Sequence, residues 1–195
     1  MTSSIAAFLC ATTLLAPQSA AETNATADAV TTARAYLKQL KTGKVKQAGI
    51  DYWHADAMLS STFGLLYLEL PEAERKRAQN AFTDFLAAPF GNKRLMDLFR
   101  SINVQSATPT KINASTVSVR LELVGDGGDF RATNTLLLQK FGTKWRITDQ
   151  SQGKQTPIRV ALTMTYLGNK KGPADSIPVV LERVVEDVRK QMQQR

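Results

Sequence analysis

The chain has 195 residues, of which 43% are hydrophobic and 22% are charged, a balance typical of a globular protein that excludes wholesale disorder. This length suffices for one domain with a core and is too short for us to expect two. The formal net charge of +8 favours an anionic partner such as a membrane surface, a lipid headgroup or an acidic protein, although solvated surface charge would explain it equally well. The Lys and Arg residues form no dense run, so we expect no nucleic-acid partner.

The first 21 residues predict a cleaved secretory signal peptide. Residues 5–16 are uncharged and mostly apolar, and they are too few to span a bilayer, which takes roughly 20 apolar residues. Residues 17–21 supply the small side chains that a signal peptidase requires, so we expect cleavage after Ala21 and a single domain over residues 22–195. Cys10 is the only cysteine and lies within the signal, so the mature chain has none for disulfide or thiolate chemistry. We therefore expect a periplasmic or secreted protein with no transmembrane anchor.

The first half of the mature chain reads as helical. Apolar residues recur at helical spacing over residues 26–40 and again over residues 52–68, where Gly64 is expected to bend the helix. Pro71, followed by acids near the positive end of the helix dipole, marks the start of a helix that continues to a break at Pro89. Residues 93–99 add another short helical segment.

The second half reads as an antiparallel sheet followed by helix. Residues 102–104 begin a short strand, and residues 117–123 alternate between apolar and polar side chains with a period of two. The glycine-rich segment 125–128 signals a turn into a partner strand over residues 130–139, and a tight connection leads to residues 145–149. Consecutive strands joined by short loops favour a meander.

Two further segments follow the strands. Residues 156–167 fit either a strand or a helix, and Thr156 and Pro157 at the start with Gly168 after the end favour the helix. Residues 176–194 form an amphipathic C-terminal helix. The whole pattern predicts an α+β fold in which N-terminal helices pack on one face of a curved antiparallel sheet, with a C-terminal helix.

His54 is the only histidine, and it lies between Asp51 and Asp56. A histidine between acids can act as a general base, but catalysis would need a further group aimed at a substrate, and a metal site would need further ligands. The sequence carries no nucleophile elbow, phosphate-cradling loop or zinc-ligand spacing. We therefore predict no catalytic residue, no cofactor and no metal site, and expect a protein that is not an enzyme.

A helical layer over a curved sheet can leave an apolar pocket suited to acyl chains. The same side chains would also form an ordinary packed core, and sequence alone leaves both arrangements open. The residues that we predict to line such a pocket are aromatic or long apolar residues of the expected helices and strands: Phe63, Leu66, Tyr67, Phe82, Phe85, Phe90, Leu121, Leu136, Leu138 and Met164.

Several segments in a fixed order resemble a known family. These are residues 70–75 leading to 81–86, the strand pair around Val117 and Leu136, and residues 145–149. Across residues 37–181 the chain resembles the periplasmic phospholipid-binding proteins of the Mla pathway, also called MlaC-type or toluene-tolerance proteins, whose fold is similar to nuclear transport factor 2. Typical members continue with apolar residues where this chain has Gln150 and Ser151.

The resemblance implies an exported carrier that binds a phospholipid or other amphiphile and exchanges it with membrane-bound components of an ABC transport system. Basic residues near the pocket mouth would contact the phosphate or a membrane, and our candidates are Lys93, Arg94 and Arg159. Two alternatives stay open at this point. One is a small enzyme of the same broad fold that uses Asp51, His54 or Asp56 in its cavity, and the other is a protein-interaction module with a filled core.

Overall fold

A computed structural model describes residues 20–153 and 155–193, so most of the predicted signal peptide, residues 1–19, lies outside the described part of the chain. The elements follow the expected order of helices, then strands, then helices. The helices are α1 Ala20–Lys41, α2 Val45–Tyr52, α3 Ala55–Phe63, α4 Leu65–Leu68, α5 Glu72–Ala87, α6 Lys93–Ser101, α7 Ile158–Asn169 and α8 Ile177–Gln193, with a 3-10 helix η1 over Ala88–Gly91. The strands are β1 Ile102–Asn113, β2 Thr116–Gly125, β3 Arg131–Phe141 and β4 Lys144–Gln152.

The four strands form one antiparallel meander in the order β1-β2-β3-β4. Alternate residues of β2 point into the core, so Val117, Val119, Leu121 and Leu123 are buried between less buried neighbours. The turn after β2 closes with hydrogen bonds from the Gly125 N–H to the Phe130 carbonyl and from the Gly128 N–H to the Gly125 carbonyl. The predicted alternation and hairpin are therefore confirmed, and β1 extends well past the short strand that we expected.

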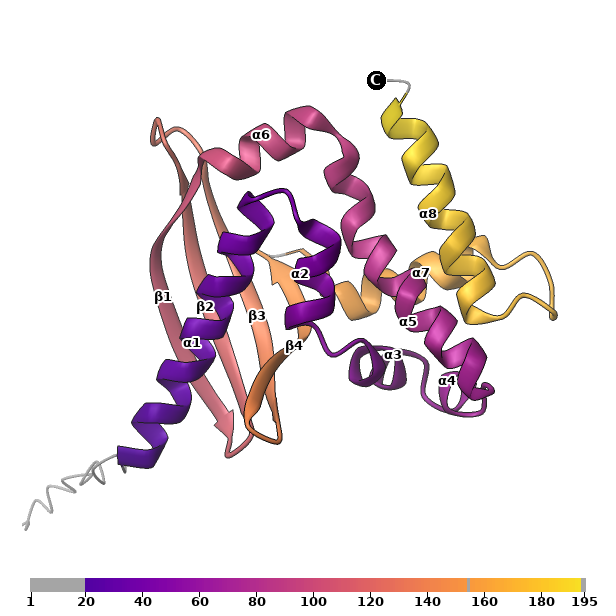
Figure 1. Cartoon of the computed structure of the whole chain (residues 1–195), viewed down its shortest axis with the longest axis horizontal. Helices are drawn as coiled ribbons and strands as arrows, with labels where there is room; N and C mark the ends of the chain where they lie inside the picture. The colour runs from indigo at the N-terminus through magenta and orange to yellow at the C-terminus, as the bar shows by residue number, and fades with distance from the viewer. Residues whose placement is uncertain (1–19, 154, 194–195) are drawn as a thin grey trace, which may run out of the picture.

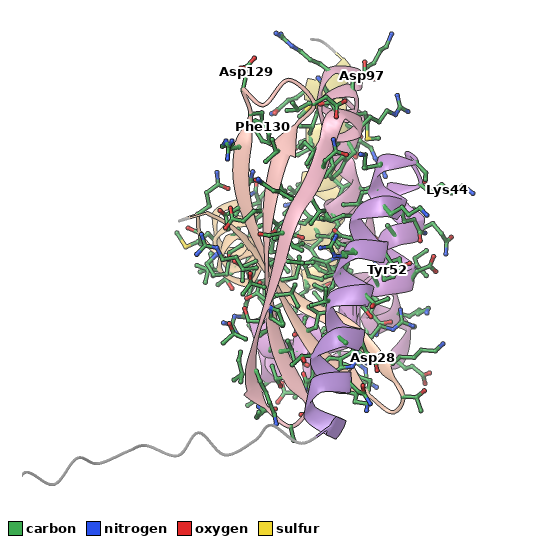
Figure 2. The ribbon with its side chains drawn as sticks, turned by 90° about the vertical axis from the view of Figure 1, so that its left-hand side faces the viewer. Asp28, Lys44, Tyr52, Asp97, Asp129 and Phe130 are labelled. Carbon is green, nitrogen blue, oxygen red and sulfur yellow. The ribbon has the colours of Figure 1, made fainter. Side chains whose placement is uncertain are left out.

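The helices cover one face of the curved sheet (Figures 1 and 2), which confirms the predicted α+β architecture. The long helix α1 lies directly on β1, β2 and β4, while α5 and α8 pack against each other farther from the sheet. Trp53 and Phe82 connect these layers, with ring centroids 5.5 Å apart in a T-shaped arrangement. The hydrophobic core thus lies between the inner sheet face and the helical layer.

The expected helix over residues 52–68 is wrong in its bounds. The structure has a separate helix α2 over Val45–Tyr52, a break at Trp53 and His54, and then α3 and α4 on either side of Gly64. Gly49 lies inside α2, where an added Cβ would sit 3.0 Å from the Thr83 Cγ2 atom. The small size of Gly49 therefore allows α2 to pack closely on α5. Gly64, with a φ of 55°, interrupts the helix between α3 and α4, at the position where we expected a bend.

Candidate functional site

Two apolar cavities lie between the helices and the sheet, one on each side of Phe99. The first, of about 300 Å³, is lined by Arg34, Leu37, Lys38, Lys41, Phe99, Ile102, Asn103, Val104 and Leu123. The second, of about 220 Å³, is lined by Tyr36, Leu40, Phe85, Leu86, Ala88, Pro89, Phe90, Phe99, Gln150, Ile158 and Val188. Phe99 belongs to both linings, so the two cavities adjoin at this residue.

The local sequence explains how Phe99 reaches this position. Pro89 lies in the short η1 helix that follows α5, and Asn92 then caps α6 by accepting a hydrogen bond from the Leu95 N–H at 3.0 Å. Helix α6 ends one residue before β1 begins, so Phe99 lies in its last turn beside the sheet edge. Its ring packs T-shaped against Phe90 with the centroids 4.8 Å apart.

Three basic residues of α1 border the first cavity. Arg34, Lys38 and Lys41 recur at helical spacing and therefore share one side of α1. Lys41 Nζ donates hydrogen bonds to the Ile102 carbonyl at 2.8 Å and to Asn103 Oδ1 at 3.3 Å, which ties α1 to β1. Arg34 and Lys38 are exposed, and neither has an ion pair or hydrogen bond with another residue in the described part of the chain. Their charges are available to an anionic group at the cavity edge.

A bulge in β4 turns one polar side chain into the second cavity. Ile147 pairs with Leu138 and Asp149 with Leu137, so the strand carries one extra residue, Thr148, at this point. The extra residue reverses the inward and outward alternation, and Gln150 pairs with the buried Leu136. The Gln150 Oε1 atom is buried, and no described residue gives it a hydrogen-bond donor. The lining of the second cavity is therefore apolar except for the Gln150 side chain, whose buried oxygen has no donor.

The ten predicted pocket residues do not form a single lining. Phe85 and Phe90 line the second cavity, as expected for pocket residues. Leu66 and Met164 are exposed, at 59% and 66%. The others are buried in the core and line neither Phe99 cavity: Phe63, Tyr67, Phe82, Leu121, Leu136 and Leu138. Contact of any of these residues with a ligand stays a prediction.

None of the predicted headgroup residues lines either cavity. Lys93 and Arg94 are exposed in the first turn of α6, and Arg159 Nε lies 3.7 Å from Asp149 Oδ2. Our sequence reasoning missed Arg34, Lys38 and Phe99. The helical spacing of the α1 cations is visible in the sequence, but the strand that they face depends on tertiary packing.

His54 and its neighbouring acids have structural partners. The Ala57 N–H donates to His54 Nδ1 at 3.1 Å, so the imidazole caps the N-terminus of α3, and its ring stacks on Phe141 at 3.8 Å. Partial burial lowers the pKa of His54 below its ordinary value of 6.5.

The two acids are likewise engaged in hydrogen bonds. Asp51 accepts from Gln39 and Gln47, and these bonds hold the pKa of Asp51 below its usual value. Asp56 accepts from the Tyr67 hydroxyl at 2.7 Å. A polar cavity of about 500 Å³ beside His54 is lined by residues that include Asp56, Lys76 and Arg146. In the described ranges, no group of three or more His, Cys, Asp or Glu side chains is arranged to hold a metal ion.

Comparison with solved structures places this arrangement in a known class of fold. The structure is similar to that of a phospholipid-binding protein from Ralstonia solanacearum in complex with a phospholipid, with a TM-score of 0.61 and 13% sequence identity. The match covers 89% of this chain and 97% of that protein. At this identity the likeness concerns the fold, and at that level it confirms the resemblance expected from the sequence. No protein-family profile and no curated relative matches the chain.

Within residues 20–153 and 155–193, no helix combines the length and the apolar composition needed to cross a bilayer.

Proposed function

We propose that this protein is an exported carrier that binds a phospholipid or another acyl-chain amphiphile and releases it chemically unchanged. The observation that carries the proposal is the pair of apolar cavities beside Phe99, in a fold similar to that of a phospholipid-binding protein. Export rests on the sequence of residues 1–21 alone. Cleavage after Ala21 would leave nearly all of α1, which spans Ala20–Lys41.

Acyl chains would displace water from the cavity walls and gain about 0.8 kcal/mol for each buried methylene. The first cavity, at about 300 Å³, reaches only the lower end of the range of about 300–1,000 Å³ that small-molecule sites occupy. A lipid with two chains therefore requires both cavities, and we expect them to join when the Phe99 ring turns aside.

The polar part of the lipid would contact two kinds of side chain, the basic residues of α1 and the amide of Gln150. Arg34 and Lys38 would form charge-assisted hydrogen bonds with a phosphate at the edge of the first cavity. Gln150 would pair with a hydroxyl or ester oxygen inside the second cavity, because an amide side chain can present either its oxygen or its nitrogen. Lys93 and Arg94 stay candidates for contact with a membrane-bound transport partner.

Blocking the cavities tests the proposal. Val104 lines the first cavity and Val188 the second, and both are half-buried, so Val104→Trp and Val188→Trp each place a large ring in one cavity. Val124→Trp is the matched control because Val124 is also half-buried and follows the inward-facing Leu123, which directs it to the opposite face of the sheet. We expect native mass spectrometry with lipid extraction to show a bound amphiphile in the parent and the control, and a loss of more than about tenfold in each cavity variant.

Circular dichroism and thermal melting must accompany the comparison, since overpacking costs about 1–3 kcal/mol by itself. The carrier function is refuted if no amphiphile copurifies with the folded parent and none binds when phospholipid is added. If the parent and all three variants retain the amphiphile equally, the ligand binds outside the two cavities beside Phe99. A folded parent without lipid would favour the interaction-module alternative.

A further inference from the structure

Exposed aliphatic side chains concentrate on α4 and α7. Large hydrophobic residues that are exposed in isolation are ordinary, whereas a contiguous group marks an interaction surface. In the part of the chain that the structure describes, nine large hydrophobic residues are exposed, and six of them belong to these two helices: Leu65, Leu66, Leu68, Val160, Met164 and Leu167. We call these six residues the aliphatic surface.

Helix α7 is apolar on two sides. Leu162 and Tyr166 are buried against the protein, whereas Val160, Met164 and Leu167 are 43%, 66% and 62% exposed and recur at helical spacing along the other side. A surface helix normally carries polar residues opposite its buried side, so the three apolar side chains on the exposed side of α7 are unusual.

One end of each part of the aliphatic surface lies near a contact between α3 and α7. The rings of Phe63 and Tyr166 meet T-shaped with centroids 5.2 Å apart, which joins the end of α3 to the end of α7. Leu65 follows Phe63 after Gly64, and Leu167 follows Tyr166, so one exposed residue of each helix lies within two residues of this contact. Figure 1 shows α4 at the lower end of α5, beside α3.

The charge around α7 is positive. Arg159 lies in its first turn and Lys170 and Lys171 follow its end, with no acid anywhere in residues 158–174. Lys170 Nζ lies 5.6 Å from the centroid of the Tyr166 ring. The nearest acids along the chain are already paired: Asp149 with Arg159 at 3.7 Å, and Asp175 with Arg183 at 3.1 Å. The residue that follows α4 is an acid, Glu69. The positive charge beside the aliphatic surface therefore lies at the two ends of α7.

We infer that the aliphatic surface docks on a lipid bilayer that contains anionic phospholipid, with α7 lying in the plane of the interface. Its aliphatic side would enter the boundary between headgroups and acyl chains, and its flanking cations would meet the phosphates. A protein partner is the less favoured occupant, because protein hot spots are enriched in Trp, Tyr and Arg and the six exposed residues are all aliphatic.

Docking in this orientation would bring a cavity to the bilayer. Ile158, at the start of α7, lines the second Phe99 cavity, and Val160 begins the exposed side two residues later. A docked α7 therefore gives a lipid a short path between the bilayer and the cavity. The docking itself does not require that the cavities hold a lipid, so the two proposals fail separately.

Vesicle cosedimentation tests the inference with the full mature chain. The vesicles are of phosphatidylcholine alone and of phosphatidylcholine mixed with phosphatidylglycerol, at low and at high salt. We expect binding to the anionic vesicles at low salt, with a loss of about fivefold for each flanking cation removed in Lys170→Gln and Lys171→Gln. Met164→Glu combined with Leu167→Glu should weaken binding by more than about tenfold.

Matched controls separate docking from general surface effects. Ile112→Glu changes a side chain that is equally exposed, at 57%, on the hairpin between β1 and β2, and Lys44→Gln removes an exposed lysine in the turn after α1 (Figure 2). Both should bind within about threefold of the parent. Lipid retention measured on the same samples should be unchanged in Met164→Glu/Leu167→Glu, since neither residue lines a Phe99 cavity.

Three results would overturn the inference: no sedimentation with anionic vesicles at low salt, equal binding by the α7 variant and the Ile112→Glu control, or crosslinking of position 164 to a protein in the absence of vesicle binding. Loss of vesicle binding with lipid retained leaves the carrier proposal standing.

Discussion

Replacing Gln150 with Leu should make the lipid-free protein more stable. The Gln150 side chain lines the second cavity, and its Oε1 atom is buried with no hydrogen-bond donor among the described residues. An unsatisfied buried acceptor costs about 1–3 kcal/mol, and an apolar side chain of similar shape removes that cost. The backbone N–H of Gln150, which donates to Asp149 Oδ1 at 2.8 Å, is unchanged by the substitution. We therefore expect Gln150→Leu to raise the free energy of unfolding by about 1–2 kcal/mol.

Thermal melting and urea unfolding of lipid-stripped protein provide the measurement. For a protein of this size, about 1 kcal/mol corresponds to a shift of about 2–4 °C in Tm. The urea midpoint should rise while the slope of the unfolding free energy with urea stays unchanged, because the surface exposed on unfolding is the same. Gln152→Leu at the exposed end of β4 is the matched control and should change stability by less than about 0.5 kcal/mol.

The lipid-bound protein should respond in the opposite direction. If Gln150 pairs with a polar group of the ligand, Gln150→Leu loses that hydrogen bond, and lipid retention should fall by about fivefold, equivalent to about 1 kcal/mol. A Gln150→Leu protein that is less stable than the parent without lipid would refute the reasoning, because it would mean that the amide oxygen has a partner in the native state.

Two further predictions concern the N-terminus and His54. Protein recovered from the extracytoplasmic fraction should begin near Glu22 by intact-mass measurement, and a chain that keeps residues 1–21 in the cytoplasm would contradict export. Because the pKa of His54 is below 6.5 in the folded protein, the unfolded chain binds its proton more readily, so the stability contributed by His54 is full above about pH 6.5 and is lost as pH falls through the folded pKa. His54→Asn, which keeps a helix-capping side chain, should remove that pH dependence in urea unfolding between about pH 8 and pH 5.5, and an unchanged profile would rule out this role of the only histidine.

Local sterics made several elements predictable. The alternation of residues 117–123 and the glycines of the β2–β3 turn specified a hairpin with one buried face, and Pro71 and Pro89 marked the ends of α5 to within a few residues. These signals act between residues that are close in sequence, so they need no knowledge of the rest of the chain.

Helix α7 shows how a local pattern becomes ambiguous. Ile158, Val160, Leu162, Met164 and Tyr166 alternate like a strand because the helix is apolar on its buried side and on its exposed side. Capping residues favoured the helix, and the structure has one over Ile158–Asn169. Which apolar side is buried depends on the contact with Phe63, which comes from a distant segment.

The sequence by itself determined the order of helices and strands, the single histidine without a complete catalytic set, and the apolar face of the sheet. Only the tertiary structure decided which apolar residues fill the core and which border a cavity, because hydrophobicity is the same in both places. Phe82 is fully buried in the core, whereas Phe99 borders two cavities because α6 ends beside the sheet edge. Gln150 faces inward because one extra residue in β4 reverses the alternation of inward and outward side chains. That bulge depends on how β4 pairs with β3, so the sequence of β4 alone does not predict it.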